Sequence, residues 1–326
     1  MFKSIGRSVL LVAGIATSVA ISLAGIAQEN YPARPLTLVI PLSAGSQMDL
    51  LGRAVADAIA RLAAQPVVVV NRDGAATTIG VEAVARAKAD GYTLGFGPDG
   101  AFVVQPHLNN NLPYKPDEFE FICQTNAAMF LFLVGPQSPY KTMADLIEAA
   151  RKAPGKLNFG TAGVATSMHL LAENVAENAG VKFSHVPFRN IGDLVVQTLN
   201  GTVDFTVSVP NMLNANSAKG MRALAVSGDG KLPNLSTLPL LRDLGLTGST
   251  PASVIGMYAP KGLPAEALAW LRNACARVAE SPEFVATAAK TLTAVEYRDA
   301  AEYARAIALG SRSNAELLKK LNISAQ

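Results

Sequence analysis

The chain has 326 residues, of which 28 are Lys or Arg and 25 are Asp or Glu, so its formal net charge is +3. This near balance argues against a nucleic-acid-binding surface, which needs a clear excess of basic residues. Two cysteines are too few for a disulfide-dense scaffold. The length suffices for one large core or for two domains of about 100–150 residues each.

The first element in chain order is an N-terminal segment typical of a secretory signal peptide. Lys3 and Arg7 precede an uncharged stretch that closes on Gly25 and Ala27, which suit the −3 and −1 positions of a cleavage site. Cleavage after Ala24 is an alternative. An uncleaved anchor helix is another, since the stretch approaches the roughly 20 residues that span a bilayer, but its Ala, Gly and Ser content favours cleavage. No later stretch is long and apolar enough to span, and we expect a soluble, exported mature chain.

Cleavage of this segment would leave an almost neutral mature chain, which keeps both cysteines. Removing Lys3 and Arg7 leaves 26 basic against 25 acidic residues, a net charge of +1. Cys123 and Cys275 lie 152 positions apart. One disulfide between them could form in an oxidising compartment, but we expect two separately buried thiols.

Strand-like apolar runs then alternate with helical segments, which predicts an α/β fold. The run LTLVI leads into a helix from about Asp49 to Ala63, and PVVVVN leads through RDGAATT into a helix near Ile79 to Ala87. GYTLGFG supplies a third strand. Units of this length imply right-handed crossovers and a mostly parallel sheet with helices on both faces.

The same alternation restarts with MFLFLVG and predicts a second domain. Its first helix lies in TMADLIEAARKAPG, with Thr142 as the N-cap and Gly155 beyond the end, and a later one lies in SMHLLAENVAENAG. The C-terminal tail is almost all helix and needs a sheet to cover, so we assign it to the first domain. The predicted boundaries are residues 1–27 for the signal peptide, 28–130 plus 251–326 for the first domain, and 131–250 for the second.

Two strand-to-helix loops built from small residues point to an anion site. They read VIPLSAGSQMDLL and NFGTAGVATSMHLL. A helix N-terminus presents unpaired N–H groups and the positive end of its dipole, and small side chains let an anion reach them. Ligands of open α/β sheets collect at such carboxyl ends of strands. Hydroxyl donors in the two loops are Ser43, Ser46, Thr161, Thr166 and Ser167. Two such loops, one in each domain, predict a carboxylate held in a cleft.

The sequence offers no enzyme or metal motif. It lacks G-x-S-x-G and H-E-x-x-H, and His107, His169 and His185 lack metal-ligand spacing. GFGPDG matches G-x-G-x-x-G, but Pro98 has no backbone donor and no clear helix follows, so we interpret it as a loop. We therefore expect no metal, no cofactor and no catalytic residue.

An ordered set of segments resembles one known family over essentially the whole mature chain. The segments are YPARPLTLVIPLSAGSQMD, PVVVVNRDGAATTIGVEAVARAKADGYTLGFG, LPYKPDEFEFI, ADLIEAARKAPGKLNFGTAG, TSMHLLAE, HVPFR, LNGTVDF, MRALAVS and YAPKGLPAEALAWL. In this order they resemble the Bug family of periplasmic solute-binding proteins, the receptors of tripartite tricarboxylate transporters. The resemblance implies a Venus-flytrap fold, in which two α/β domains joined by crossover strands close over a small organic acid, often a di- or tricarboxylate.

The resemblance also implies ligand-binding residues. In the family the first loop holds one carboxylate largely through backbone groups and ordered water, a role that carries over to Ala44, Gly45 and Asp49. We expect Asp49 to cap the helix and fix the loop rather than to touch the anion. The second-domain loop carries over to Gly163, Thr166, Ser167 and His169. His169 alone would more often be a packed helix residue, and only the family pattern places it beside the pocket.

Five positions depart from the usual family pattern. Where A-G-G-x-T-D is usual, this chain has Ser46 and Met48, and Met48 is either core or a soft pocket wall. Pro98 and Asp99 stand where small hydroxyl residues are usual, and Ser208 replaces a carboxylate. Asp99 would repel a second ligand carboxylate unless it met an amino or hydroxyl donor; alternatively, it faces solvent. We expect one ligand carboxylate to be retained and the far end of the ligand to differ from a plain dicarboxylate.

These inferences together predict a periplasmic solute-binding receptor and not an enzyme. Its cleft would close by hinge motion near residues 128–134 and 248–256 and deliver the acid to the permease subunits of a tripartite tricarboxylate-type transporter. We expect a monomer with no nucleic-acid partner. A receptor that serves a signalling partner without transport is the alternative, and a periplasmic enzyme is a weaker one.

Overall fold

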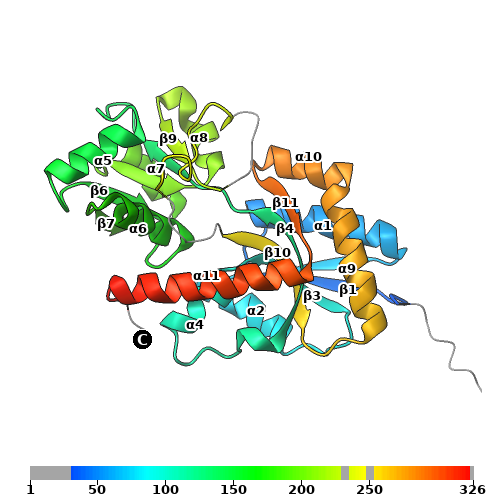
Figure 1. Cartoon of the computed structure of the whole chain (residues 1–326). Coiled ribbons are helices and arrows are strands. Elements are labelled where there is room, and N and C mark those ends of the chain that lie inside the picture. The colour runs from blue at the N-terminus through cyan, green and yellow to red at the C-terminus, as the bar shows by residue number, and fades with distance from the viewer. Residues whose placement is uncertain (1–30, 229–234, 247–252, 324–326) are drawn as a thin grey trace, which may run out of the picture. The chain divides into compact units, whose positions relative to one another are not determined.

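The computed structural model describes residues 31–228, 235–246 and 253–323, and the predicted signal peptide lies outside them. The described strands form a six-stranded sheet in the order β11-β4-β10-β3-β1-β2 and a five-stranded sheet in the order β7-β6-β8-β5-β9 (Figure 1). Within these ranges, no helix has both the length and the apolar character needed to cross a membrane.

The first sheet is built from both ends of the chain. Its strands are β1 (Leu36–Ile40), β2 (Val67–Asn71), β3 (Thr93–Pro98), β4 (Phe119–Ala127), β10 (Val254–Pro260) and β11 (Ala294–Arg298). Its helices are α1 (Gln47–Ala63), α2 (Thr78–Ala85), the short α3 (Gly100–Val103) and α4 (Gln105–Leu108), α9 (Ala265–Glu280), α10 (Pro282–Lys290) and α11 (Ala300–Lys320).

Alternation along β1 explains why helices cover both faces of this sheet. Leu38 belongs to a buried apolar cluster that includes residues of α1, α9 and α10, whereas the next residue, Val39, belongs to a cluster that includes residues of α2, α3 and α11. Successive side chains of a strand point to opposite faces, so the sheet is apolar on both. The C-terminal helices α9 and α11 pack on β4, and α10 packs on α1.

The second sheet comes from the middle of the chain. Its strands are β5 (Leu131–Val134), β6 (Asn158–Thr161), β7 (Ser184–Pro187), β8 (Phe205–Ser208) and β9 (Arg222–Val226), and its helices are α5 (Met143–Lys152), α6 (Ser167–Ala179), α7 (Ile191–Leu199) and α8 (Pro210–Asn216). The predicted cap of α5 is confirmed, because the Thr142 hydroxyl accepts a hydrogen bond from the Asp145 N–H at 3.1 Å.

The α/β fold class with two sheets is confirmed, but the sheets are mixed rather than mostly parallel. Of the nine strand pairings among the described residues, four are parallel and five are antiparallel. The antiparallel pairs arise where the chain changes sheets. The chain leaves the first sheet after β4 and enters the second with β5. It returns with β10, which is antiparallel to both of its neighbours, β3 and β4. The domain boundaries stay a prediction.

The two cysteines form a disulfide, so the expectation of two separate thiols is wrong. Cys123 on β4 and Cys275 on α9 are bonded, with their Cα atoms 6.4 Å apart. Both are fully buried in one apolar cluster. The pairing follows from the packing of α9 on β4, a tertiary contact that spacing along the chain does not reveal.

Candidate functional site

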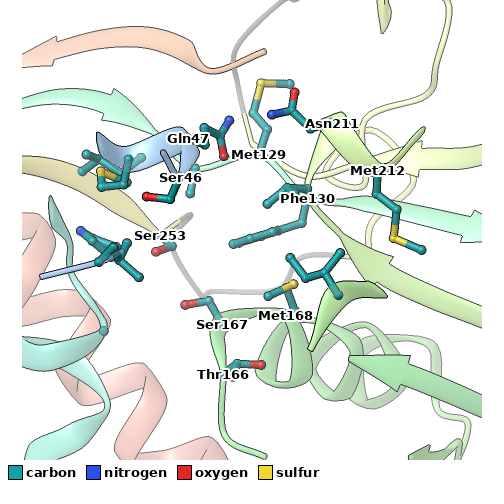
Figure 2. A pocket seen from close by; sticks show the side chains of 18 of the residues that line it. Ser46, Gln47, Met129, Phe130, Thr166, Ser167, Met168, Asn211, Met212 and Ser253 are labelled. Atoms are coloured by element: carbon teal, nitrogen blue, oxygen red, sulfur yellow. The ribbon is translucent and has the colours of Figure 1, made fainter. Parts of the chain in front are cut away.

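A cavity of about 690 Å³ is lined by loops and helices associated with both sheets (Figure 2). The N-termini of α1 and α6 contribute to the lining, as do α7, α8 and the segments just before β5 and β10. Its labelled residues in Figure 2 are Ser46, Gln47, Met129, Phe130, Thr166, Ser167, Met168, Asn211, Met212 and Ser253.

The N-terminus of α1 presents backbone donors to this cavity. Ser46 is the N-cap: its hydroxyl accepts from the Asp49 N–H at 3.2 Å and its carbonyl accepts from the Leu50 N–H at 3.1 Å. The N–H groups of Gln47 and Met48 come earlier in the first turn and have no partner within the helix. Both residues line the cavity, so the positive end of the α1 dipole lies at its wall.

The N-terminus of α6 repeats this arrangement. The hydroxyl of Thr166 accepts from the His169 N–H at 3.3 Å, and its carbonyl accepts from the Leu170 N–H at 2.9 Å. The N–H groups of Ser167 and Met168 are therefore the ones left without a partner within the helix, and both residues line the cavity. Two helices associated with different sheets thus place residues with unpaired backbone donors at the wall of one cavity.

The first loop is held in place by the carboxylate of Asp49. This buried group accepts from the Gly45 N–H at 2.9 Å, from Asn71 Nδ2 at 2.9 Å and from Arg53 Nε at 3.0 Å. Burial alone would raise the pKa of Asp49, but the hydrogen bonds from Arg53, Gly45 and Asn71 outweigh it and lower the pKa below its usual value. The expected loop-fixing role is confirmed, whereas the capping role belongs to Ser46.

The second loop is supported by two stacked histidines. The Thr161 hydroxyl donates to the carbonyl of Gly163 at 3.0 Å and lies within hydrogen-bond distance of Nε2 of His185, at 2.7 Å. His169 accepts the Ala165 N–H on Nδ1 at 2.9 Å, and its ring stacks on His185 with centroids 3.8 Å apart. Burial, reinforced by the neighbouring His169, lowers the pKa of His185 to about 4. Neither histidine is part of the described lining, so both support the loop on the side away from the cavity.

Asp99 lies at the point where the chain re-enters the first sheet. Its carboxylate accepts from the Ser253 hydroxyl and from the Val254 N–H, the latter at 3.1 Å. The side chain is buried, so the alternative that it faces solvent is wrong. Burial raises the pKa of Asp99 to about 6 despite these hydrogen bonds. Ser253 lines the cavity and Asp99 lies directly behind it.

The structure brings only part of the sequence-predicted set to the cavity wall. Ser46, Thr166 and Ser167 line it, together with Met48 and Pro98. Exposed positions of the adjoining loop are Ser43, Ala44 and Gly45; wholly or partly buried positions outside the described lining are Asp49, Asp99, Thr161, Gly163, His169 and Ser208. The Ser208 hydroxyl has no hydrogen-bond partner among the described residues. Which of these residues contact a ligand stays a prediction.

The sequence did not predict several residues that line the cavity. Met129 and Phe130 lie between β4 and β5, and Met212 lies on α8. In the sequence these apolar residues are typical of a core. The helix α8 carried one usable signal, because Pro210 at its first position is typical of a helix start.

The two sheets and the cavity between helix N-termini define a ligand-binding protein with the two-domain Venus-flytrap fold. The family model described as "Tripartite tricarboxylate transporter family receptor" matches residues 51–323, and the chain belongs to this family of solute-binding receptors.

Relatives and solved structures agree with this assignment. The chain is 32% identical to the UPF0065 protein in the tcbD-tcbE intergenic region of a Pseudomonas species, over 86% of this chain and 84% of the relative. It is 28% identical to the protein BugT of Bordetella pertussis, over 78% of each chain. Among solved structures, periplasmic binding protein BugD has a TM-score of 0.73 at 26% identity, covering 91% of this chain and all of that one. An R. palustris protein solved with adipate has a TM-score of 0.77 at 26% identity and 91% coverage of this chain.

Proposed function

We propose that this protein captures a small organic acid by a carboxylate group and delivers it to the permease of a tripartite tricarboxylate-type transporter. The observation that carries the proposal is the convergence of two helix N-termini on one cavity. Four backbone N–H groups, those of Gln47, Met48, Ser167 and Met168, belong to residues of its wall and have no partner within their helices. Such donors, with the aligned helix dipoles, favour an anion.

Family membership and one structural neighbour support a carboxylate as that anion. The chain belongs to a family of tricarboxylate transporter receptors, and a similar protein of R. palustris was solved with adipate. The hydroxyls of Ser46, Thr166 and Ser167 add possible donors at the same wall. No residue is proposed as a catalyst, because binding and release are sufficient for this role.

Delivery by domain closure and export by the N-terminal signal peptide are parts of the same proposal. The segment between β4 and β5 and the segment just before β10 meet beside the cavity, where the Ala128 N–H donates to the Ser253 carbonyl at 2.7 Å. A hinge there would let the α6 side close on the α1 side, so that ligand contacts stabilise the closed state. Residues 248–252 of the second predicted hinge lie outside the described residues.

A thermal-shift screen over carboxylic acids, amino acids and neutral analogues tests the binding step. A ligand that binds only the folded state raises the melting temperature, so at least one carboxylate should do so while its amide does not. Ser167→Ala should weaken the best hit about fivefold or more, whereas Ser217→Ala, an exposed position outside the described lining, should not. If no acid gives a shift, the proposal fails.

Uptake measurements test the delivery step. Deleting the gene should abolish uptake of the identified labelled acid, and supplying the gene again should restore it. If uptake persists and only a transcriptional response to the acid is lost, the protein is a sensory receptor and the transport part of the proposal is overturned.

A further inference from the structure

We propose that the bound acid is a monocarboxylate with a bulky apolar body, aliphatic or aromatic, rather than a di- or tricarboxylate. This inference rests on the proposed function and specifies the class of acid. It concerns the part of the cavity wall that the carboxylate would not contact.

The wall has a hydroxyl-bearing part and a mainly apolar part, in which the amide of Asn211 is an uncharged polar group. Figure 2 shows Ser46, Ser253 and Ser167 on one side of the view and Phe130, Met168 and Met212 toward the other. The ring of Phe130 offers a flat apolar surface to this space. Thioether side chains are flexible and polarizable, and they pack well against apolar groups of varied shape.

The wall offers no cation for a second carboxylate. None of the described residues that line the cavity has a charged side chain. Two carboxylates lie directly behind the lining: Asp99 accepts a hydrogen bond from the Ser253 hydroxyl, and Asp49, which fixes the loop before Ser46, is already paired with Arg53. Burying a second ligand carboxylate here would cost much of its hydration without an opposite charge in return.

Apolar surface at the wall remains open to solvent. Val164 is 58% exposed and Ile191 is 41% exposed, and both line the cavity. A ligand with an apolar body would remove this surface from water, which is favourable in proportion to the area covered. A compact, multiply charged acid would leave it exposed.

A matched ligand pair tests the inference. Hexanoate and adipate have the same chain length and differ by one terminal carboxylate, so calorimetric titration of the full-length mature protein with each isolates the effect of the second charge. We expect hexanoate to bind at least about tenfold more tightly. Equal or tighter binding of adipate overturns this inference and leaves the proposed function standing. If neither these acids nor any other carboxylate of the screen binds, the proposed function itself fails.

Two adjacent valines of α7 provide a matched pair of variants. Val195 lines the cavity, whereas Val196 is 50% exposed and lies outside the described lining. Thr has nearly the shape of Val but replaces a methyl by a hydroxyl. Val195→Thr should weaken hexanoate binding about fourfold or more, and Val196→Thr should leave it unchanged. Equal affinities of the two variants, with both melting like the wild type, would overturn the apolar contact.

Discussion

Replacing Asp99 by Asn should change how the stability of the protein depends on pH. Burial raises the pKa of Asp99 from 3.8 to about 6, so the folded state binds this proton more tightly than the unfolded chain does. The stability that Asp99 contributes is therefore full below about pH 4 and is lost as the pH rises through about 6. About two pKa units correspond to ~3 kcal/mol. The asparagine keeps an oxygen that can accept from the Val254 N–H, and it carries no charge at any pH.

Urea unfolding of both proteins between about pH 4 and pH 7.5 measures this effect. The free energy of unfolding of Asp99→Asn minus that of the wild type should fall by about 2 kcal/mol on acidification across this range, most of the full effect. The wild type is subtracted because His185 also changes the stability over this range. Its pKa is lowered from 6.5 to about 4, so the stability that it contributes is lost as the pH falls through this interval, opposite in sign to the effect of Asp99. A difference that stays constant, or that grows on acidification, would refute the assignment of a destabilised buried carboxylate.

Three further changes have defined outcomes. Cys123→Ala combined with Cys275→Ala should lower the free energy of unfolding by up to about 5 kcal/mol, because the bridge closes a loop of 152 residues; urea unfolding measures the loss. Asp49→Ala should cost about 2–3 kcal/mol and weaken ligand binding at least about tenfold, because it releases the first loop; thermal melts and titrations of the variant measure both. Gly95→Ala should cost more than about 2 kcal/mol in the same unfolding assay, because its new methyl would overlap the buried Tyr258 ring.

Matched controls sharpen these three tests. A reductant should reproduce the effect of the cysteine replacements, and no effect of either would contradict the bridge. Asp49→Asn keeps an acceptor for the loop and should restore part of the lost affinity; equal losses for both variants would show that charge alone matters. Gly100→Ala meets no atom within 4 Å and should be nearly neutral, so an equal cost there would remove the overlap as the cause.

Local patterns predicted the elements whose apolar spacing is complete within one segment. The run LTLVI, the stripe along α1 and the Thr142 cap are of this kind, because strand alternation, helical periodicity and caps are all local. The strand β11 was missed because five residues between two helices look like part of a helical tail. Its residues Val295 and Tyr297 are exposed, which is typical of a half-solvated edge strand. The pairing of β10 with β3 and β4 and the disulfide are long-range contacts, and no local sequence pattern predicts them.

The candidate site was predicted where its chemistry is carried by the backbone. Small residues and hydroxyls before a helix are readable, and they led to Ser46, Thr166 and Ser167. The apolar wall was not predicted, because Phe130 and Met212 have the composition of a core and become a cavity surface only through tertiary packing. The burial of Asp99 was likewise invisible, since it depends on a segment about 150 positions away in the sequence.

The central place of β10 sets the order in which the molecule can form. β3 and β4 follow each other along the chain, yet they do not pair; β10, which begins at Val254, lies between them. Until that strand has been synthesised, both neighbours have an open edge, and open edges invite pairing with other chains. The first sheet therefore cannot be completed from its N-terminal strands alone. A chain that stops short of Val254 should be aggregation-prone and dependent on chaperones, even if its second sheet has folded.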